Sequence, residues 1–380
     1  MASYDVTALD SPLTLDTATT PSRSCSVVKI DDTHVVIAYT GTDDDGFIRA
    51  FSINATTGEM TALGTALEFD TGNAVNIAMC MINATQMMLF WKGVDSDGFT
   101  QVFTVDTGTW AVTAESTPVE YQAVDVNHYG NPVLVDSTHV LHAWQDAASG
   151  DGFAQVFSVV AGAVVPVLTP FEFDTADANS MALAEVDDTH YLLTYGGVGN
   201  DGFAVVLAVN AITFAVTAAG SAYEFDTLQG IWNTLAQVDS THFVNFWCGD
   251  AADGFAQVLT VNTGTWAVTE EGTALEFDTA DSTNNSCIAL GSGYFINFWN
   301  DAGATQGEVR VFNVDGSFAV TAVGTSVVTF DATEALGNKS CLLTSDWVVN
   351  VWSVSNVLTA QVFEVEIPVV AETTSSTIMF

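Results

Sequence analysis

The chain repeats one unit of about 52 residues seven times, and this repeat limits the possible folds more than any other feature. An Asp-x-Thr-His tetrad ends at His34, His139, His190 and His242, and degenerate copies end at Gln86, Tyr294 and Trp347, with spacings of 51 to 53 residues. An aromatic residue recurs at the same spacing, at Tyr39, Trp91, Trp144, Tyr195, Trp247, Trp299 and Trp352. The tripeptide Asp-Gly-Phe begins at Asp45, Asp97, Asp151, Asp201 and Asp253. Because three independent markers agree, the chain is an array of repeats.

Each unit contains the pattern of four short strands, which we name A to D in chain order. In the second unit the pattern predicts strands over residues 78–82, 87–91 and 99–105, and a fourth that starts at 110–114. Asp97-Gly98 stands between the second and third strands, where it predicts a tight hairpin turn. The unit therefore resembles one four-stranded antiparallel meander.

These units predict an all-β, seven-bladed β-propeller with four antiparallel strands per blade. Strand B is apolar on both faces, as in Val35 to Tyr39, so protein must cover both of its sides. Four-stranded units that flank one another in this way are typical of propellers, which have about four to eight blades. A β-solenoid needs shorter turns, and separate immunoglobulin-like domains need about twice the residues per unit.

The ends of the sequence predict how the ring closes. Residues 13–17 (LTLDT) match the blade-end segments 67–71 (LEFDT) and 275–279 (LEFDT), but no blade precedes them. We therefore expect the N-terminal segment to pair with the last blade, so that the sheet has no free edge at the seam. Residues 1–365 then form a single propeller. Residues 366–380 form a C-terminal tail that either adds an outer strand or projects away.

The charge balance excludes several classes of partner. The chain has 46 acidic and 6 basic residues, a formal net charge of −40, although 48% of its residues are hydrophobic. Nucleic acid and anionic membrane surfaces would be repelled by such a surface. No run reaches the ~20 apolar residues of a membrane span, so we expect no membrane insertion. The N-terminus lacks the pattern of a signal peptide.

Acidic residues gather on one side of the predicted propeller. This side carries the loops that join strand B to strand C and the loops that join strand D to strand A of the next blade. We call this side of the propeller the Asp-Gly face. Asp43, Asp45, Asp95 and Asp97 are weak calcium candidates, because Asp-x-Asp-Gly resembles the start of an oxygen-ligand loop. No further ligands follow the glycines, which favours plain turn chemistry. We expect no other cofactor.

Departures from the repeat indicate candidate ligand-binding residues, because a purely structural position is repeated. On the Asp-Gly face these departures include His128, Tyr129, Trp232 and Asp301. Drift within a repeat protein is the alternative. The seven strand-B aromatics could stack on sugar rings, but packing between blades explains them better. The four tetrad histidines lie in separate blades, so we expect them to hydrogen-bond within their own hairpins.

No catalytic motif stands out, and we expect a protein that is not an enzyme. The chain has no Gly-x-Ser-x-Gly, phosphate loop, HExxH or CxxC. The turn from Thr104 to Trp110 resembles the Asp-box of sialidase-like propellers, one residue short. Three arginines are too few for the cluster that sialidases use.

Several phrases of the repeat resemble propellers of marine phages and aquatic bacteria. They are Val-Asp-Ser-Thr-His-Phe, Asp-Gly-Phe-Ala-Gln-Val-Phe and Thr-Trp-Ala-Val-Thr with Leu-Glu-Phe-Asp-Thr, and the resemblance covers about residues 13–365. It implies a phage virion surface protein, a tail-fibre or capsid-associated adhesin that binds host glycan or another virion protein. The absent signal peptide fits a virion location. One alternative is a purely structural decoration protein of the virion, and another is a secreted lectin or glycan-active enzyme.

Overall fold

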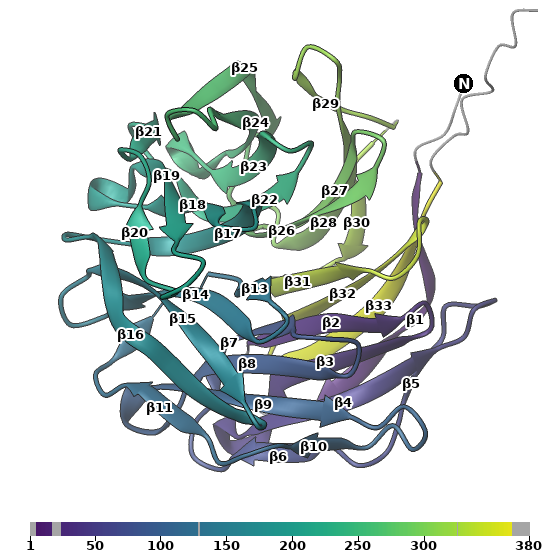
Figure 1. The fold of residues 1–380 in the computed structure, drawn as a ribbon. Coiled ribbons are helices and arrows are strands. Elements are labelled where there is room, and N and C mark those ends of the chain that lie inside the picture. The colour runs from purple at the N-terminus through teal and green to yellow at the C-terminus, as the bar shows by residue number, and fades with distance from the viewer. Residues whose placement is uncertain (1–4, 17–23, 128–129, 325, 367–380) are drawn as a thin grey trace, which may run out of the picture.

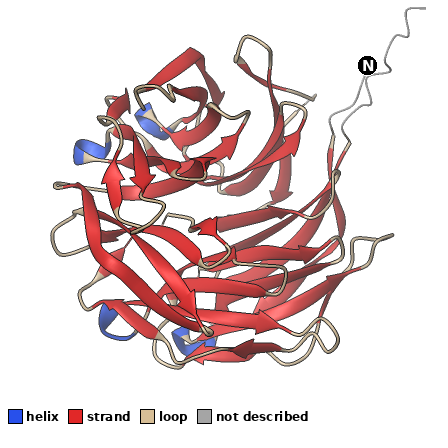
Figure 2. Ribbon diagram, viewed as in Figure 1, coloured by secondary structure: helices blue, strands red, loops and turns tan. Residues whose placement is uncertain are grey.

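The computed structural model describes residues 5–16, 24–127, 130–324 and 326–366. Over these residues seven antiparallel sheets surround a central axis, as Figure 1 shows. The predicted all-β, seven-bladed propeller is therefore confirmed. Figure 2 shows a strand-rich molecule whose helical elements are short turns. Within the described residues, no helix is long and apolar enough to cross a membrane.

Blades one to four follow one another along the chain. Blade one contains β2 (Cys25–Asp31), β3 (His34–Thr40), β4 (Gly46–Ile53), β5 (Met60–Ala62) and β6 (Leu67–Asp70). Blade two contains β7 (Val75–Met81), β8 (Gln86–Lys92), β9 (Gly98–Val105), β10 (Val112–Ala114) and β11 (Val119–Gln122). Blade three contains β12 (Val126–Asn127), β13 (Val133–Asp136), β14 (His139–Asp146), β15 (Gly152–Val160) and β16 (Ala163–Asp174). Blade four contains β17 (Asn179–Asp187), β18 (His190–Gly196), β19 (Gly202–Val209), β20 (Val216–Ala218) and β21 (Tyr223–Asp226).

Blades five to seven complete the ring. Blade five contains β22 (Ile231–Gln237), β23 (His242–Cys248), β24 (Gly254–Val261) and β25 (Val268–Asp278). Blade six contains β26 (Ser282–Gly291), β27 (Tyr294–Asp301), β28 (Gln306–Val314), β29 (Val320–Ala322) and β30 (Val328–Asp331). Blade seven contains β31 (Leu336–Leu342), β32 (Trp347–Val354), β33 (Val357–Val365) and the N-terminal β1 (Val6–Asp16). Four 3-10 turns, η1 (Thr42–Asp44), η2 (Val94–Ser96), η3 (Val198–Asn200) and η4 (Asp250–Ala252), lie in loops between strands B and C.

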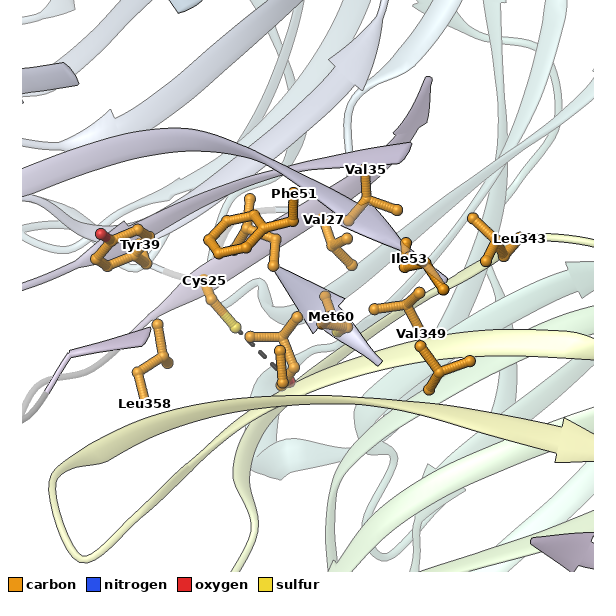
Figure 3. Close-up of a cluster of buried hydrophobic side chains, with 14 residues drawn as sticks. Cys25, Val27, Val35, Tyr39, Phe51, Ile53, Met60, Leu343, Val349 and Leu358 are labelled. Atoms are coloured by element: carbon orange, nitrogen blue, oxygen red, sulfur yellow. Dashed lines mark hydrogen bonds between the residues drawn. The ribbon is translucent and has the colours of Figure 1, made fainter. Parts of the chain in front are cut away.

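The N-terminal strand closes the ring, as the sequence predicted. β1 pairs antiparallel with β33, from Val6 opposite Val365 to Asp16 opposite Leu358, and Figure 1 shows the two strands side by side. Figure 3 shows blade one packed against blade seven at this seam, with Val27 and Ile53 near Val349. The Cys25 thiol donates to the Val351 carbonyl at 3.7 Å. The tail residues 367–380 lie outside the described residues.

The core consists of apolar layers between neighbouring blades. Each of the seven buried clusters of the described chain joins two adjacent sheets, and the one at the seam joins β2, β3 and β4 to β32 and β33. Strand B supplies most of these side chains from both of its faces. Trp91, Trp144, Trp299 and Trp352 are fully buried there. The strand-B aromatics therefore pack between blades, so they present no ring to a ligand.

An aspartate at the end of each of five blades binds the buried aromatic of the next blade. The indole Nε1 donates to the carboxylate Oδ2 in Trp91–Asp70 (2.6 Å), Trp247–Asp226 (2.9 Å), Trp299–Asp278 (2.6 Å) and Trp352–Asp331 (2.9 Å), and the Tyr195 hydroxyl donates to Asp174 (3.0 Å). The other oxygen, Oδ1, accepts backbone N–H groups of the following turn, as from Leu228 and Gln229 to Asp226. In blade two Gln122 stands at this position, and the buried Trp144 Nε1 makes no hydrogen bond with a described residue.

The tetrad histidines hydrogen-bond within their own hairpins, which confirms that prediction. In blade one His34 Nδ1 lies 2.9 Å from Asp31 Oδ1. Burial acts to raise the pKa of Asp31, but the hydrogen bonds from His34 and Thr33 outweigh it and lower that pKa below its ordinary value. His34 also stacks on Trp110 of the next blade at 3.6 Å, and the pairs His139–Phe214, His190–Trp266 and His242–Phe318 repeat this contact.

The predicted hairpin turn at Asp-Gly is wrong in position. In blade two the positive φ angles belong to Asp95 (57°) and Ser96 (70°), and Gly98 is already the first residue of β9. A Cβ on Gly98 would lie 2.7 Å from the Tyr121 ring, and one on Gly46 would lie 2.4 Å from the Phe69 ring. The glycine is therefore needed for space beneath the blade-end aromatic, since its backbone is extended.

We predict that Asp226→Ala destabilises the propeller by about 1–3 kcal/mol, because the buried Trp247 indole and the turn after Asp226 lose their acceptor. Urea unfolding at neutral pH measures this difference. Asp188→Ala removes the same charge from an exposed position and serves as the control. Equal stabilities of the two variants would show that the blade-end carboxylate contributes nothing beyond its charge.

We predict that deletion of residues 1–16 exposes the edge of β33 and lowers the melting temperature, with self-association visible by light scattering. A synthetic peptide of residues 5–16, added in trans, should restore both properties because it can pair again with β33. A truncated chain that stays monomeric and melts like the full chain would contradict the importance of this closure.

Candidate functional site at the mouth of the central channel

A bulge recurs where strand A begins, next to the central axis. In five blades the pairing of strands A and B skips two residues, for example between Ile231 and Thr234. The first skipped residue has a positive φ of 50° to 64° in every case, and these residues are Asn76, Ser180, Trp232, Asn284 and Gly337. Bulges re-aim side chains and are frequent beside functional sites. All five residues line one cavity.

The cavity opens at the channel mouth on the Asp-Gly face and has a volume of about 610 Å³. It is lined from six blades by residues at the start of strand A, together with Asn300, Ala302 and Thr305 from blade six. Amides and hydroxyls dominate its polar wall. Glu334 and Lys339 are the only charged side chains among the described lining residues. The size and the convergence of polar groups are typical of a small-molecule site.

Trp232 is the large aromatic residue of this wall. Its side chain is 38% exposed, and it stacks on no other ring of the described chain. Its φ of 55° is unusual for a bulky residue. Four other aromatics with positive φ, Trp110, Phe214, Trp266 and Phe318, each stack on a tetrad histidine. Trp232 shares its positive φ with the other bulge residues, but its indole stacks on no described ring, so packing explains the backbone and not the exposed aromatic side chain.

Paired asparagines fix the backbone behind the cavity in three consecutive blades. The strand-B amide donates to the strand-A amide in Asn245–Asn233 (3.0 Å), Asn297–Asn285 (2.9 Å) and Asn350–Asn338 (3.0 Å). Asn233 and Asn338 in turn donate to the Gly230 and Ala335 carbonyls at 2.7 and 2.8 Å. These buried amides hold the bulges in place, which leaves the bulged side chains as the ones directed at the cavity.

Five polar groups of the wall make no hydrogen bond to another described residue. They are the Asn76 amide, the Ser180 hydroxyl, the Trp232 indole N–H, the Glu334 carboxylate and the Lys339 ammonium group. They include donors, acceptors and one charge of each sign. A ligand with several hydroxyl groups could use both kinds of group at once.

Three carboxylates meet just outside this wall, where the end of blade five meets blade six. The ligand oxygens of Asp278, Asp301 and Glu308 lie within 4.8 Å of one another, and this is the one such group among the described residues that could hold a metal ion. Glu308 stands where other blades have the phenylalanine of Asp-Gly-Phe. Burial raises the pKa of Glu308 to about 7, a hydrogen bond from Gln306 opposes this, and the carboxylates of Asp278 and Asp301 add to it.

The structure places the remaining sequence candidates as follows. Trp232 lines the cavity, whereas Asp301 is only 7% exposed and belongs to the carboxylate group. Asp43 and Asp95 are exposed in the loops of blades one and two, next to Asp45 and Asp97. Burial and the nearby Glu68, Asp43 and Asp70 raise the pKa of Asp45. Calcium binding by these four aspartates stays a prediction.

His128 and Tyr129 lie outside the described residues. In the sequence Tyr129 stands 15 residues before Trp144, as Trp232 stands 15 before Trp247, so the two share one position of the repeat. Sequence reasoning missed Asn76, Ser180 and Lys339. Counting back 15 residues from the strand-B aromatic would have found Asn76 and Ser180, and counting back 13 residues would have found Lys339. Residues at equal distances before this aromatic occupy equal places in the ring.

Comparisons with known proteins show the fold and no family. No protein-family model matches the chain, and no curated protein matches it. A proposed 6-phosphogluconolactonase from Bacteroides uniformis shares 11% identity at a TM-score of 0.60, over 81% of this chain and 85% of that one. Another proposed 6-phosphogluconolactonase, from Bacteroides fragilis, shares 14% identity at a TM-score of 0.58, over 92% of each chain. The periplasmic gluconolactonase PpgL of Pseudomonas aeruginosa shares 12% at 0.54, over 78% of this chain and 85% of that one.

We predict that Glu308 makes the fold less stable as pH rises from about 4.5 to 7. Its pKa is higher in the folded chain than in the unfolded chain, so the fold favours the protonated form and loses stability once the proton leaves. Glu308→Gln should therefore be more stable than the wild type at pH 8, on the order of 1 kcal/mol after solvent screening, and the difference should be much smaller at pH 5.

Urea unfolding at pH 5 and pH 8 measures both differences. The exposed Glu276→Gln on the neighbouring blade is the control for loss of one negative charge. The same stability gain at pH 8 in both variants would assign the effect to net charge and contradict a specific role of the group of Asp278, Asp301 and Glu308.

Proposed function

We propose that this propeller is a non-enzymatic binding protein that holds a saccharide at the mouth of its central channel. The observation that carries the proposal is Trp232, an exposed indole in a strained backbone conformation at the rim of a polar cavity. An aromatic face offers a sugar ring an apolar surface, while its N–H donates a hydrogen bond. The bulge recurs in five blades and the Asn285 amide donates to the Trp232 carbonyl at 3.3 Å, so the backbone is held by the fold, whereas the exposed indole stacks on no other described ring.

The rest of the wall suits a polyhydroxylated ligand. Asn76 and Ser180 carry amide and hydroxyl groups on the bulges of blades two and four, and neither makes a hydrogen bond to another described residue. The asparagine pairs behind the wall hold its backbone in position before a ligand arrives. A preorganised polar wall lowers the entropic cost of binding.

The proposed absence of catalysis rests on the chemistry of the cavity wall. Cys25 is the one thiol among the described lining residues, and it donates to the Gly337 carbonyl at 3.5 Å. Burial raises the pKa of Cys25 to about 12, with Lys339 opposing this, so the thiolate nucleophile is scarce at neutral pH. The alternative function is that of a lactonase, after the names of the proteins with a similar fold. Hydrolysis of sugar lactones by the purified protein would establish that activity.

The location of the protein in a phage virion, with other virion proteins or host surface glycan as partners, stays a prediction from the repeat phrases. A saccharide site fits an adhesin and a secreted lectin equally well. A decoration protein without a ligand needs no such site, so saccharide binding would separate it from both. Immunogold labelling of phage particles from the source environment would then separate the adhesin from the lectin.

We predict that Trp232→Ala weakens saccharide binding at least about tenfold, because the indole supplies the stacking surface. A glycan array identifies the ligand, and calorimetry with the purified glycan measures the loss. Trp110→Ala is the matched control, since Trp110 stacks on His34 in a C–D turn, away from the channel mouth. Equal losses in both variants, or none in either, would contradict a site at Trp232.

A further inference from the structure

We propose that the ligand of this channel carries an anionic group, a carboxylate, sulfate or phosphate on the saccharide, and that Lys339 binds it. This inference rests on the proposed saccharide site and specifies its ligand class. Lys339 lies on β31, two residues after the bulged Gly337. It lines both the cavity at the mouth and a second cavity of about 240 Å³ that continues along the channel.

Lys339 departs from the structural role of its position in the repeat. The residue 13 positions before the strand-B aromatic is Ser26, Ala78, Asn131, Ala182, Thr234, Ser286 or Lys339. The polar members accept a backbone N–H of the next blade, as Ser26 from Met79 (3.1 Å), Asn131 from Leu183 (2.9 Å), Thr234 from Cys287 (3.2 Å) and Ser286 from Ser340 (3.1 Å). A lysine ammonium group has no lone pair to accept such a bond, so Lys339 cannot take part in this series of hydrogen bonds between blades.

Lys339 forms no ion pair within the described chain, although the protein has 46 acidic residues. The other two lysines do, with Lys29 2.7 Å from Asp32 and Lys92 2.5 Å from Asp125. Glu334, the only acid among the described lining residues, does not pair with it. A cation in the channel wall that pairs with no described acid is available to an anionic partner that arrives from outside.

The surroundings of Lys339 strengthen such a contact. The side chain is enclosed by the channel wall yet exposed to the channel space, and the loss of bulk water lowers the pKa of its amine. An ion pair formed in such an enclosed space is screened less by salt than one at the outer surface. Charge-assisted hydrogen bonds are also about twice as strong as neutral ones. An acidic sugar that stacks on Trp232 would therefore gain affinity from Lys339.

The experiment compares saccharides that differ only in charge. Calorimetry in 0.5 M NaCl, which screens the net charge of the protein, measures binding of an oligouronate and its carboxyl-reduced neutral form, and of a sulfated and an unsulfated oligosaccharide. We expect the wild type to prefer one acidic form about tenfold. Lys339→Met should lower the affinity for the acidic form to that for its neutral form. The affinity for the neutral form should not change. Lys29→Met is the control and should keep the preference.

A second measurement separates the two proposals. Amine acetylation read by mass spectrometry follows the three lysines at once, and inorganic sulfate or acetate should protect Lys339 but neither Lys29 nor Lys92. Neutral and acidic saccharides that bind equally, in the wild type and in Lys339→Met, would overturn the anionic ligand while the saccharide site stands. Protection by sulfate without binding of any saccharide would overturn the saccharide and keep the anion site. Absence of both protection and charge preference would overturn the role of Lys339.

Discussion

The carboxylate at the end of five of the blades is the contact on which the ring depends. One oxygen of Asp226 accepts the backbone of its own turn, and the other accepts the buried indole of Trp247 in the next blade. A single residue thus ends one blade and fixes the position of the next. The phenylalanine before it covers the glycine that starts strand C, so the Glu-Phe-Asp and Asp-Gly-Phe motifs form one interface. Much of the net charge therefore belongs to the architecture.

The sequence predicted the blade count and ring closure because the residues that make the interfaces are repeated in it. It did not predict the bulges of strand A, since hydrophobic alternation records which face is buried and not where the ladder skips residues. The Asp97-Gly98 turn was placed two residues too late for a related reason. A glycine in a sequence can indicate either a positive φ or a place with no room for a side chain. Only the structure, in which the Tyr121 ring lies over Gly98, shows that the second reason applies here.

The candidate site was predicted in part. Trp232 was found because it departs from the repeat, and the structure places it on the cavity wall. Asp301 departs as well, yet it is buried beside Asp278 and Glu308, so a departure can also reflect a local exchange of packing partners. Lys339 was overlooked because a single lysine in a strand is usually at the surface. Only its place on the innermost strand of the ring makes it a candidate for binding.

The charge of the protein and the charge of its channel act on different steps of binding. The net charge of −40 repels an acidic ligand at long range and therefore slows its approach, but salt at 0.1 M screens this repulsion beyond about 10 Å. Lys339 acts at contact inside the channel, where screening is weaker, and so slows dissociation. Salt should then speed association more than it speeds release. A −40 protein can thus select an anionic ligand in a saline medium, because the repulsion is screened there and the contact is retained.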